Sequence, residues 1–363
     1  MKNICIVVGA RPNFMKVAPI IRAIKESGKE KGLAYQLVYT GREDDPTLEG
    51  SLFEDLQIAR PDICLGVECE NLNELTGQVM SAFEHYLQMR PADVVIVVDD
   101  LASTMAVSIV TKKQGVRLAH IAAGTRSFDI NMPKEINRLV IDGLSDVLLT
   151  AGISNNSNAN RGGTELSKVY MVGNILMDTL RFNYHRLKAP LLADGMRVKE
   201  GDYLLFTLNR KALLADKENL KRMLEMMLAQ AGGLPILAPL RGRAAAVVKE
   251  LVGDRIKLQP PFGYLEFGWL MAHARGVITD SGNVAEEATF YGVPCITLNS
   301  YTEHIETVKV GSNVLVGEDP ELLGKSMADM VSGQWKKCAI PDRWDGRTAE
   351  RILQIIVEGD RRR

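Results

Sequence analysis

The stretch HIAAGTRSFDINMPKEINRLVID, His120 to Asp142, contains the end of an apolar strand, a glycine turn and a helix start in direct succession. The apolar strand covers Leu118 to Ile121, the turn falls at Gly124, and Pro133 begins a helix with Glu135 in its first turn. This order is typical of parallel α/β sheets, in which ligands bind beyond the carboxyl ends of the strands. The stretch therefore predicts a fold class and a place for a site.

Apolar runs of strand length alternate with amphipathic helical patterns on both sides of this stretch. The runs of the first half are ICIVVG, AYQLVYTG, DVVIVVDD, RLAHIAAG, DVLLTAG and VYMVGN. After a polar stretch, Leu187 to Asp202, the second set is YLLFTL, PILAPL, RIKLQP, GVITDS, PCITL and NVLVG. This alternation predicts an α/β protein with two Rossmann-like, doubly wound domains that face a central cleft.

The length of 363 residues also favours two domains, because one hydrophobic core rarely serves so long a chain. We expect residues 1–185 to form an N-terminal Rossmann-like domain and residues 186–345 a C-terminal one. The helical pattern within residues 346–363 has no strand after it to complete a crossover. We expect this C-terminal helix to pack back on the first domain.

The composition argues against nucleic acid or a membrane as a partner. Lys plus Arg number 44 against 45 Asp plus Glu, and no stretch approaches the ~18 to 20 uninterrupted apolar residues of a membrane span. The five cysteines are odd in number and lack the spacing of zinc ligands. We therefore expect a soluble cytoplasmic protein with reduced thiols, no metal and no cofactor.

The segment GARPNFMK places Gly9 at a strand end, with Arg11 beside it and Lys16 about one helical turn further along. Backbone N–H groups at such a helix start, together with two cations, suit a diphosphate. The alternative is a solvated turn with ordinary surface charges.

The segment TDSGNVAEEA forms a second candidate anion site. Ser281 and Gly282 end a buried strand and open a helix, and Glu286 and Glu287 lie in its second turn. The helix start suits a phosphate, and a carboxylate there can accept both hydroxyls of a ribose. The alternative is an N-capped helix that needs no ligand.

Taken together, the chain resembles the UDP-N-acetylglucosamine 2-epimerase family, of glycosyltransferase-B-type fold. The motifs that carry the resemblance are GARPNFMKVAPI, FEDL, KKQGVRLAHIAAGTRSFD, MPKEINRL, VYMVGNILMDTL, GYLEF, TDSGNVAEEATFYGVPCITL and TEHIETVKVGSNVLVG. The resemblance implies a reaction that removes the proton at C2 of the sugar, eliminates UDP, and adds UDP back with C2 inverted. Such chemistry needs side chains that exchange protons near pH 7.

The family supplies these groups from four positions, and only one is kept in this chain. The family's aspartate falls on Asp100. The glutamate of its HxEAG motif falls on Ala122, the first glutamate of its PEE motif on Lys134, and a histidine on Asn209. Alanine cannot accept a proton, asparagine does not titrate, and lysine reverses the local charge.

The positions that the resemblance assigns to UDP are kept. They are Arg11, Lys16, Ser281, Gly282, Glu286, Glu287 and Glu303. Other departures are TGRED at Thr40 to Asp44, where the family has TGQH, and Asp99, where it has glycine. The C-terminal domain is therefore the expected UDP-binding domain.

Glu135 and His304 are candidates for substitute acids or bases, and we expect His120 to bond to neighbouring backbone. Asp99 could pair with Asp100 and raise one of their pKa values, but adjacent strand residues point to opposite faces.

The favoured hypothesis is a homologue that binds UDP or a UDP-N-acetylhexosamine and has lost or altered C2 epimerisation, as a partner or regulatory subunit would. An active 2-epimerase that uses Asp100 with substitute groups is the alternative, and hydrolysis or glycosyl transfer is a third. The resemblance also implies a homodimer and a role in polysaccharide biosynthesis.

Overall fold

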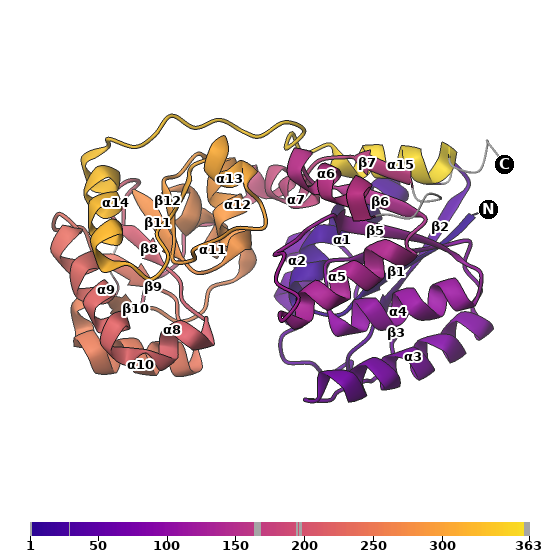
Figure 1. Cartoon of the computed structure of the whole chain (residues 1–363). Helices are drawn as coiled ribbons and strands as arrows, with labels where there is room; N and C mark the ends of the chain where they lie inside the picture. The colour runs from indigo at the N-terminus through magenta and orange to yellow at the C-terminus, as the bar shows by residue number, and fades with distance from the viewer. Residues whose placement is uncertain (1, 29, 163–167, 194, 196–197, 359–363) are drawn as a thin grey trace. The chain divides into compact units, whose positions relative to one another are not determined.

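The computed structural model describes residues 2–28, 30–162, 168–193, 195 and 198–358, and Figure 1 shows its helices and strands. Contacts divide the chain into two units. Unit 1 is Met1–Phe182 with Asp342–Arg363, and unit 2 is Asn183–Pro341. Each unit is built on its own parallel sheet.

Unit 1 contains a seven-stranded sheet in the order β3-β2-β1-β4-β5-β6-β7. All of its strand pairs are parallel. The strands are β1 (Lys2–Val8), β2 (Leu33–Tyr39), β3 (Ile63–Cys64), β4 (Val94–Val98), β5 (Arg117–Ala123), β6 (Val147–Thr150) and β7 (Lys168–Met171). The chain reverses its direction of travel across the sheet between β1 and β4, so the loops after these strands diverge and leave room for a ligand.

Helices follow the strands of unit 1 and cover both faces of its sheet. They are α1 (Arg11–Ser27), α2 (Gly50–Leu56), α3 (Leu72–Met89), α4 (Ala102–Lys113), α5 (Pro133–Leu144), α6 (Ile153–Gly162), α7 (Ile175–Asn183) and α15 (Thr348–Glu358). Cys5 and Val7 of β1 face a core formed with α3, α4 and α5. The connection from β1 to β2 runs across the sheet in the direction opposite to the connection from β4 to β5. Because both are right-handed, α1 lies on the other face of the sheet, where Phe14 contacts Tyr39 and Phe53. There α15, from the C-terminal part of the chain, packs against α1.

Unit 2 contains a six-stranded parallel sheet in the order β10-β9-β8-β11-β12-β13. The strands are β8 (Leu204–Phe206), β9 (Ile236–Ala238), β10 (Lys257–Leu258), β11 (Gly276–Thr279), β12 (Cys295–Thr297) and β13 (Asn313–Leu315). The helices are α8 (Lys211–Ala215), α9 (Lys217–Gln230), α10 (Gly242–Val252), α11 (Tyr264–Ala272), α12 (Gly282–Tyr291), α13 (Glu306–Lys309) and α14 (Pro320–Ser332), with 3-10 turns η1 (Tyr184–Arg186) and η2 (Gly253–Arg255).

Successive residues of β8 belong to two different cores of unit 2, as the pleat of a strand requires. Leu204 and Phe206 pack with α8, α9, α10 and α14. Tyr203 and Leu205 pack with α11 and α12. Both faces of the sheet are thus buried, which explains why its strands appear in the sequence as continuous apolar runs.

The predicted fold class is confirmed, since both sheets are parallel and alternate with helices. Residues Ile63–Cys64 form the short edge strand β3, which was not predicted from the sequence. Across the described part of the chain, no helix combines the length and apolar character needed to span a bilayer.

Candidate functional site

The carboxyl ends of β1, β4 and β5 lie side by side in unit 1, and with their loops we call them the unit 1 edge. In the loop after β1, the N–H groups of Gly9 and Ala10 both donate to Asn13 Oδ1, at 3.0 and 3.1 Å. Arg11 is partly exposed in the first turn of α1, whereas Lys16 is buried. The two predicted cations are therefore on one helix, but in different environments.

Lys16 forms an ion pair with Asp99. Its Nζ lies 2.7 Å from Asp99 Oδ1, and Asn13 Nδ2 donates to Asp99 Oδ2 at 2.8 Å. Burial alone would raise the pKa of the Asp99 carboxyl, but the Lys16 charge and the hydrogen bonds from Lys16 and Asn13 lower it below its usual range. The Asp99 carboxylate is thus held ionised against α1.

Asp100 faces a different helix from its neighbour. Arg138 of α5 donates to Asp100 Oδ2 from Nε at 2.7 Å and from Nη2 at 2.6 Å. The Nζ of Lys134 lies 3.6 Å from Asp100 Oδ1. Asp99 has a φ of 60°, and this backbone conformation lets the adjacent carboxylates reach cations on separate helices. The two carboxylates therefore do not share a proton.

Glu135 lies next to this pair but is fully engaged. Its Oε2 accepts from the Ser127 N–H at 2.8 Å and the Ser127 hydroxyl at 2.9 Å, and Arg138 Nη1 lies 3.2 Å away. Burial would raise the Glu135 pKa, but the hydrogen bonds from Ser127 and Arg138 lower it. The structure thus joins Asp100 and Glu135 through Arg138.

His120 lies behind the unit 1 edge and is buried. Its Nδ1 lies 2.7 Å from Asp142 Oδ1, and its Nε2 lies 3.0 Å from the carbonyl oxygen of Asp99. Arg126 Nη1 lies 2.7 Å from the other Asp142 oxygen. The ring thus lies between the Asp142 carboxylate and the Asp99 carbonyl oxygen. His120 therefore fixes the backbone of Asp99 from behind.

Sequence reasoning missed Asn13, Arg126 and Asp142. A signal for Asp142 exists, since Glu135, Arg138 and Asp142 are spaced i, i+3 and i+7 in α5 and share its buried face. A buried polar stripe of this kind indicates partners at the end of a sheet.

Three of the four positions at which the resemblance predicts proton carriers hold Ala122, Lys134 and Asn209. Ala122 has a φ of 64° at the end of β5. The Lys134 side chain is 60% exposed. Asn209 is exposed in the loop after β8, and its N–H donates to Asp280 Oδ2 at 2.7 Å.

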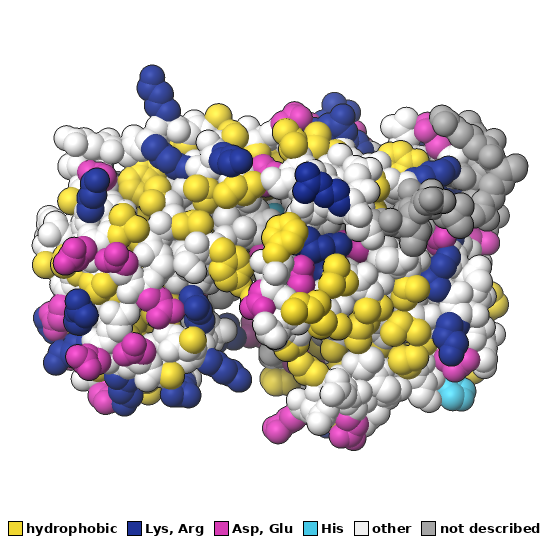
Figure 2. All heavy atoms as spheres, in the orientation of Figure 1, with side chains coloured by type: hydrophobic (Ala, Val, Ile, Leu, Met, Phe, Trp, Pro, Cys, Tyr) yellow, Lys and Arg dark blue, Asp and Glu magenta, His cyan; other side chains and the backbone are white. Residues whose placement is uncertain are grey.

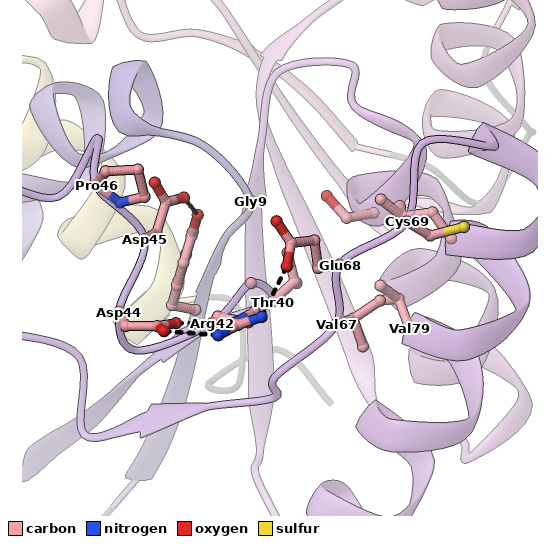
Figure 3. Close-up of a pocket in the computed structure, with 14 residues that line it drawn as sticks. Gly9, Thr40, Arg42, Asp44, Asp45, Pro46, Val67, Glu68, Cys69 and Val79 are labelled. Atoms are coloured by element: carbon pink, nitrogen blue, oxygen red, sulfur yellow. Dashed lines mark hydrogen bonds and ion pairs between the residues drawn. The ribbon is translucent and has the colours of Figure 1, made fainter.

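A cavity of about 510 Å³ lies beside the unit 1 edge, lined by Gly9, Ser103 and the loops after β2 and β3. Arg42 reaches across part of it and pairs with Asp44 at 2.6 Å and Glu68 at 3.0 Å (Figure 3). The TGRED sequence at Thr40 to Asp44 thus lies on the wall of this cavity.

The carboxyl ends of β8 and β11 are neighbours in unit 2, and with the loop after β12 they form the unit 2 edge. Ser281 stands at the N-terminus of α12 but makes no side-chain cap hydrogen bond to this helix within the described residues. Gly282 is the exposed first residue of α12. The alternative that Ser281 serves only as a helix cap is therefore weakened, because the capping hydrogen bond is not formed in the described part of the chain.

Glu286 and Glu287 are buried one turn into α12. The loop after β12 carries Glu303, which is partly buried, and His304, whose Nε2 lies 3.2 Å from Glu286 Oε1. Burial raises the pKa of Tyr291, and the Glu287 carboxylate raises it further. The structure thus brings His304 together with a predicted ribose-binding carboxylate.

The comparisons with known proteins decide the family. The family model for UDP-N-acetylglucosamine 2-epimerase matches residues 25–357. The chain belongs to the UDP-N-acetylglucosamine 2-epimerase family. Its relatives include the UDP-N-acetylglucosamine 2-epimerase of Methanocaldococcus jannaschii, 33% identical over 374 residues that cover 98% of this chain and 99% of the relative.

Three further comparisons agree with this assignment. The UDP-2,3-diacetamido-2,3-dideoxy-D-glucuronate 2-epimerase of Pseudomonas aeruginosa is 34% identical over 329 residues, 89% of this chain and 91% of that protein. The crystal structure of the M. jannaschii 2-epimerase with UDP-GlcNAc and UDP has a TM-score of 0.83 and 32% identity, and covers 98% of this chain and 100% of the other. The Neisseria meningitidis 2-epimerase structure has a TM-score of 0.86 at 23% identity, covers 99% of this chain and 100% of its own, and supports the fold alone.

Proposed function

We propose that this family member binds UDP or a UDP-N-acetylhexosamine and has lost or altered the C2 epimerisation of its family. The observation that carries the proposal is that the predicted UDP-binding residues are kept, whereas most of the predicted proton-exchanging residues are replaced. The predicted UDP-binding residues stand at the two sheet edges, whereas three of four proton-exchanging positions are Ala122, Lys134 and Asn209. The M. jannaschii relative, whose structure contains UDP-GlcNAc and UDP, supports the ligand class.

The unit 2 edge supports nucleotide binding. An α-helix leaves its first N–H groups without helical partners, and these groups with the Ser281 hydroxyl suit a phosphate. Glu286 and Glu287 supply carboxylates within one further turn, as the hydroxyls of a ribose require. We assign the ribose and one phosphate of the ligand to these groups.

The unit 1 edge supports the loss of proton transfer. Asp100 already accepts two hydrogen bonds from Arg138 and has Lys134 at 3.6 Å, so a substrate proton must compete with two cations. Glu135 is committed to Ser127 and Arg138. Losing one general acid or base reduces a rate by about 10² to 10⁴, and three such losses leave little catalysis.

An active 2-epimerase is the second candidate, and the His304 geometry favours it. The buried Nδ1 of His304 has no hydrogen-bond partner among the described residues, while Nε2 faces Glu286. Histidine paired with a carboxylate is a common general acid or base. If this candidate is right, the wild-type protein epimerises UDP-GlcNAc, and both Asp100→Asn and His304→Gln abolish turnover.

Calorimetric titration with UDP tests the binding half of the proposal. We expect saturable binding that Glu286→Gln weakens, because glutamine accepts fewer hydrogen bonds than a buried carboxylate. Glu321→Gln is a matched control, since Glu321 lies in the first turn of α14 and is exposed. Absence of binding to the wild-type protein contradicts this half.

Restoring the replaced groups tests the catalytic half. The triple variant Ala122→Glu, Lys134→Glu, Asn209→His returns a carboxylate or histidine to each of the three positions. We expect no interconversion of UDP-GlcNAc and UDP-ManNAc by the wild-type protein and detectable interconversion by the triple variant. Turnover by the wild-type protein at an enzymatic rate contradicts the proposed loss.

We also propose that the protein is a homodimer that joins two copies of unit 1. Figure 2 shows hydrophobic side chains gathered on one face of unit 1, over α4 and α5. Ile136 and Leu139 of α5 are 41% and 43% exposed, and Phe128 and Ile130 before it are 78% and 59% exposed. An exposed apolar patch on this scale favours a partner surface. Light scattering should give a molecular mass twice that of the chain, and Leu139→Glu should reduce this mass to that of a single chain.

All five cysteines are free thiols, which supports our expectation of a reducing, cytoplasmic location.

A further inference from the structure

The backbone at Asp99 adopts a conformation that an L-residue seldom takes. Its φ of 60° lies in the left-handed region, where the side chain crowds the following carbonyl. Aspartate tolerates this region better than most residues, but the conformation still needs support from its surroundings.

The surroundings hold Asp99 at three points. The Asp99 N–H donates to the Ile121 carbonyl at 3.3 Å, and the Asp99 carbonyl oxygen lies 3.0 Å from His120 Nε2. Its carboxylate accepts from Lys16 at 2.7 Å and Asn13 at 2.8 Å. A strained residue that is held by β5 and by α1 indicates a functional constraint.

The contact with Lys16 neutralises a cation at the place where the unit 1 edge would receive an anion. The side chains of Lys16 and Asp99 are only 9% and 19% exposed, so water screens their attraction weakly. The N–H groups of Gly9 and Ala10 are also satisfied within the loop, by Asn13. A ligand phosphate therefore meets groups that already have partners.

We propose that Asp99 is a specificity-determining residue whose carboxylate occupies Lys16 in place of a ligand anion. A phosphate group binds Lys16 only by displacing this carboxylate, so Asp99 weakens the binding of phosphate-bearing ligands at the unit 1 edge. The remaining exposure of the Asp99 side chain leaves it open to such exchange. The inference rests on the proposed function, because UDP is the anion in question.

Asp99→Asn tests the proposal, because asparagine keeps the size of the side chain, tolerates a positive φ and carries no charge. A charge-assisted hydrogen bond contributes about tenfold or more to an equilibrium, so we expect Asp99→Asn to bind UDP about tenfold more tightly than the wild-type protein. Inorganic diphosphate should show the same gain, which assigns the effect to the phosphates. Asp93→Asn is the matched control, since Asp93 is exposed before the other end of β4.

The Lys16→Met background shows whether the gain acts through Lys16. In that background, Asp99→Asn should not change UDP affinity, whereas independent effects would add. Asp99→Gly relieves the positive φ and should give the same tighter binding, although it lowers the melting temperature because the buried Lys16 loses its partner. If Asp99→Asn and Asp99→Gly only lower the melting temperature and leave affinity unchanged, the pair is structural and the proposal is overturned.

The outcomes separate this inference from the proposed function. Binding of UDP by the wild-type protein with equal affinity in Asp99→Asn overturns the inference alone. Binding only by Asp99→Asn supports the inference and overturns UDP binding by the natural chain. Binding by neither protein overturns both.

Discussion

Arg138→Met removes a buried cation that pairs with two carboxylates of the unit 1 edge. The Arg138 side chain is 2% exposed, and its nitrogens lie 2.6 Å from Asp100 Oδ2 and 3.2 Å from Glu135 Oε2. Methionine fills much of the same volume but leaves both carboxylates without this partner. Breaking a buried ion pair on one side costs ~3–5 kcal/mol. We expect the free energy of unfolding of unit 1 to fall by about 3 kcal/mol, the lower limit of that range, because Ser127 and Lys134 still contact the carboxylates.

The loss should depend on pH with a definite sign. Burial raises the Glu135 pKa, but hydrogen bonds from Ser127 and Arg138 outweigh burial and lower it. A carboxyl whose folded pKa is lowered stabilises the fold above its unfolded pKa of about 4.3, and this contribution disappears as the pH falls through the folded pKa. The penalty of Arg138→Met should therefore be full at pH 7 and shrink below about pH 4.

Urea unfolding followed by Trp344 fluorescence measures this penalty in unit 1. The chain has three tryptophans, and replacing Trp269 and Trp335 with phenylalanine leaves only the buried Trp344 of unit 1. Arg347→Met is the matched control, because Arg347 pairs with Glu350 at a mostly exposed site and such pairs contribute about 0–1 kcal/mol.

Glu135→Gln should recover part of the loss when it is combined with Arg138→Met, since it removes one of the two stranded charges. A penalty below about 1 kcal/mol, or one that Glu135→Gln does not alter, refutes the assignment of Arg138 as the cation of this network.

Two further substitutions test the backbone of unit 1. Gly124→Ala would place a Cβ 2.0 Å from the Asn155 carbonyl oxygen at a φ of 74°, whereas Gly115 has a φ of 72° with open space around it. We expect Gly124→Ala to lower the free energy of unfolding by at least ~1 kcal/mol more than Gly115→Ala, and equal effects would contradict the close contact. The Asp178 carboxylate accepts from two backbone N–H groups at the start of α15, at 3.0 and 2.8 Å. Asp178→Ala should therefore destabilise unit 1 by ~1–2 kcal/mol and Asp178→Asn by less, as measured by the Trp344 transition.

The fold could be predicted from the sequence because every long strand is buried on both faces. A run such as Val94–Val98 is apolar throughout, and its length and the helix after it identify a parallel strand. The strand Ile63–Cys64 was not predicted from the sequence, because two partly buried residues at a sheet edge give no periodic hydrophobic pattern.

The candidate site was predictable only as far as local pattern reaches. Strand ends and helix starts placed Lys16, Asp100 and Ser281 at carboxyl edges of sheets. The pairing of Lys16 with Asp99 joins residues 83 positions apart and depends on the positive φ of Asp99. Such contacts are decided by tertiary packing, which is why the sequence suggested an anion site where the structure has an internal ion pair.

The central claim is that ligand binding has outlasted proton transfer at the sugar. One NMR sample of the wild-type protein with UDP-GlcNAc in heavy water measures both. We predict saturation transfer from the protein to the uridine protons, which reports binding, and a C2 proton signal that persists without exchange for deuterium. Loss of the C2 signal at an enzymatic rate, or absence of saturation transfer, would contradict the account.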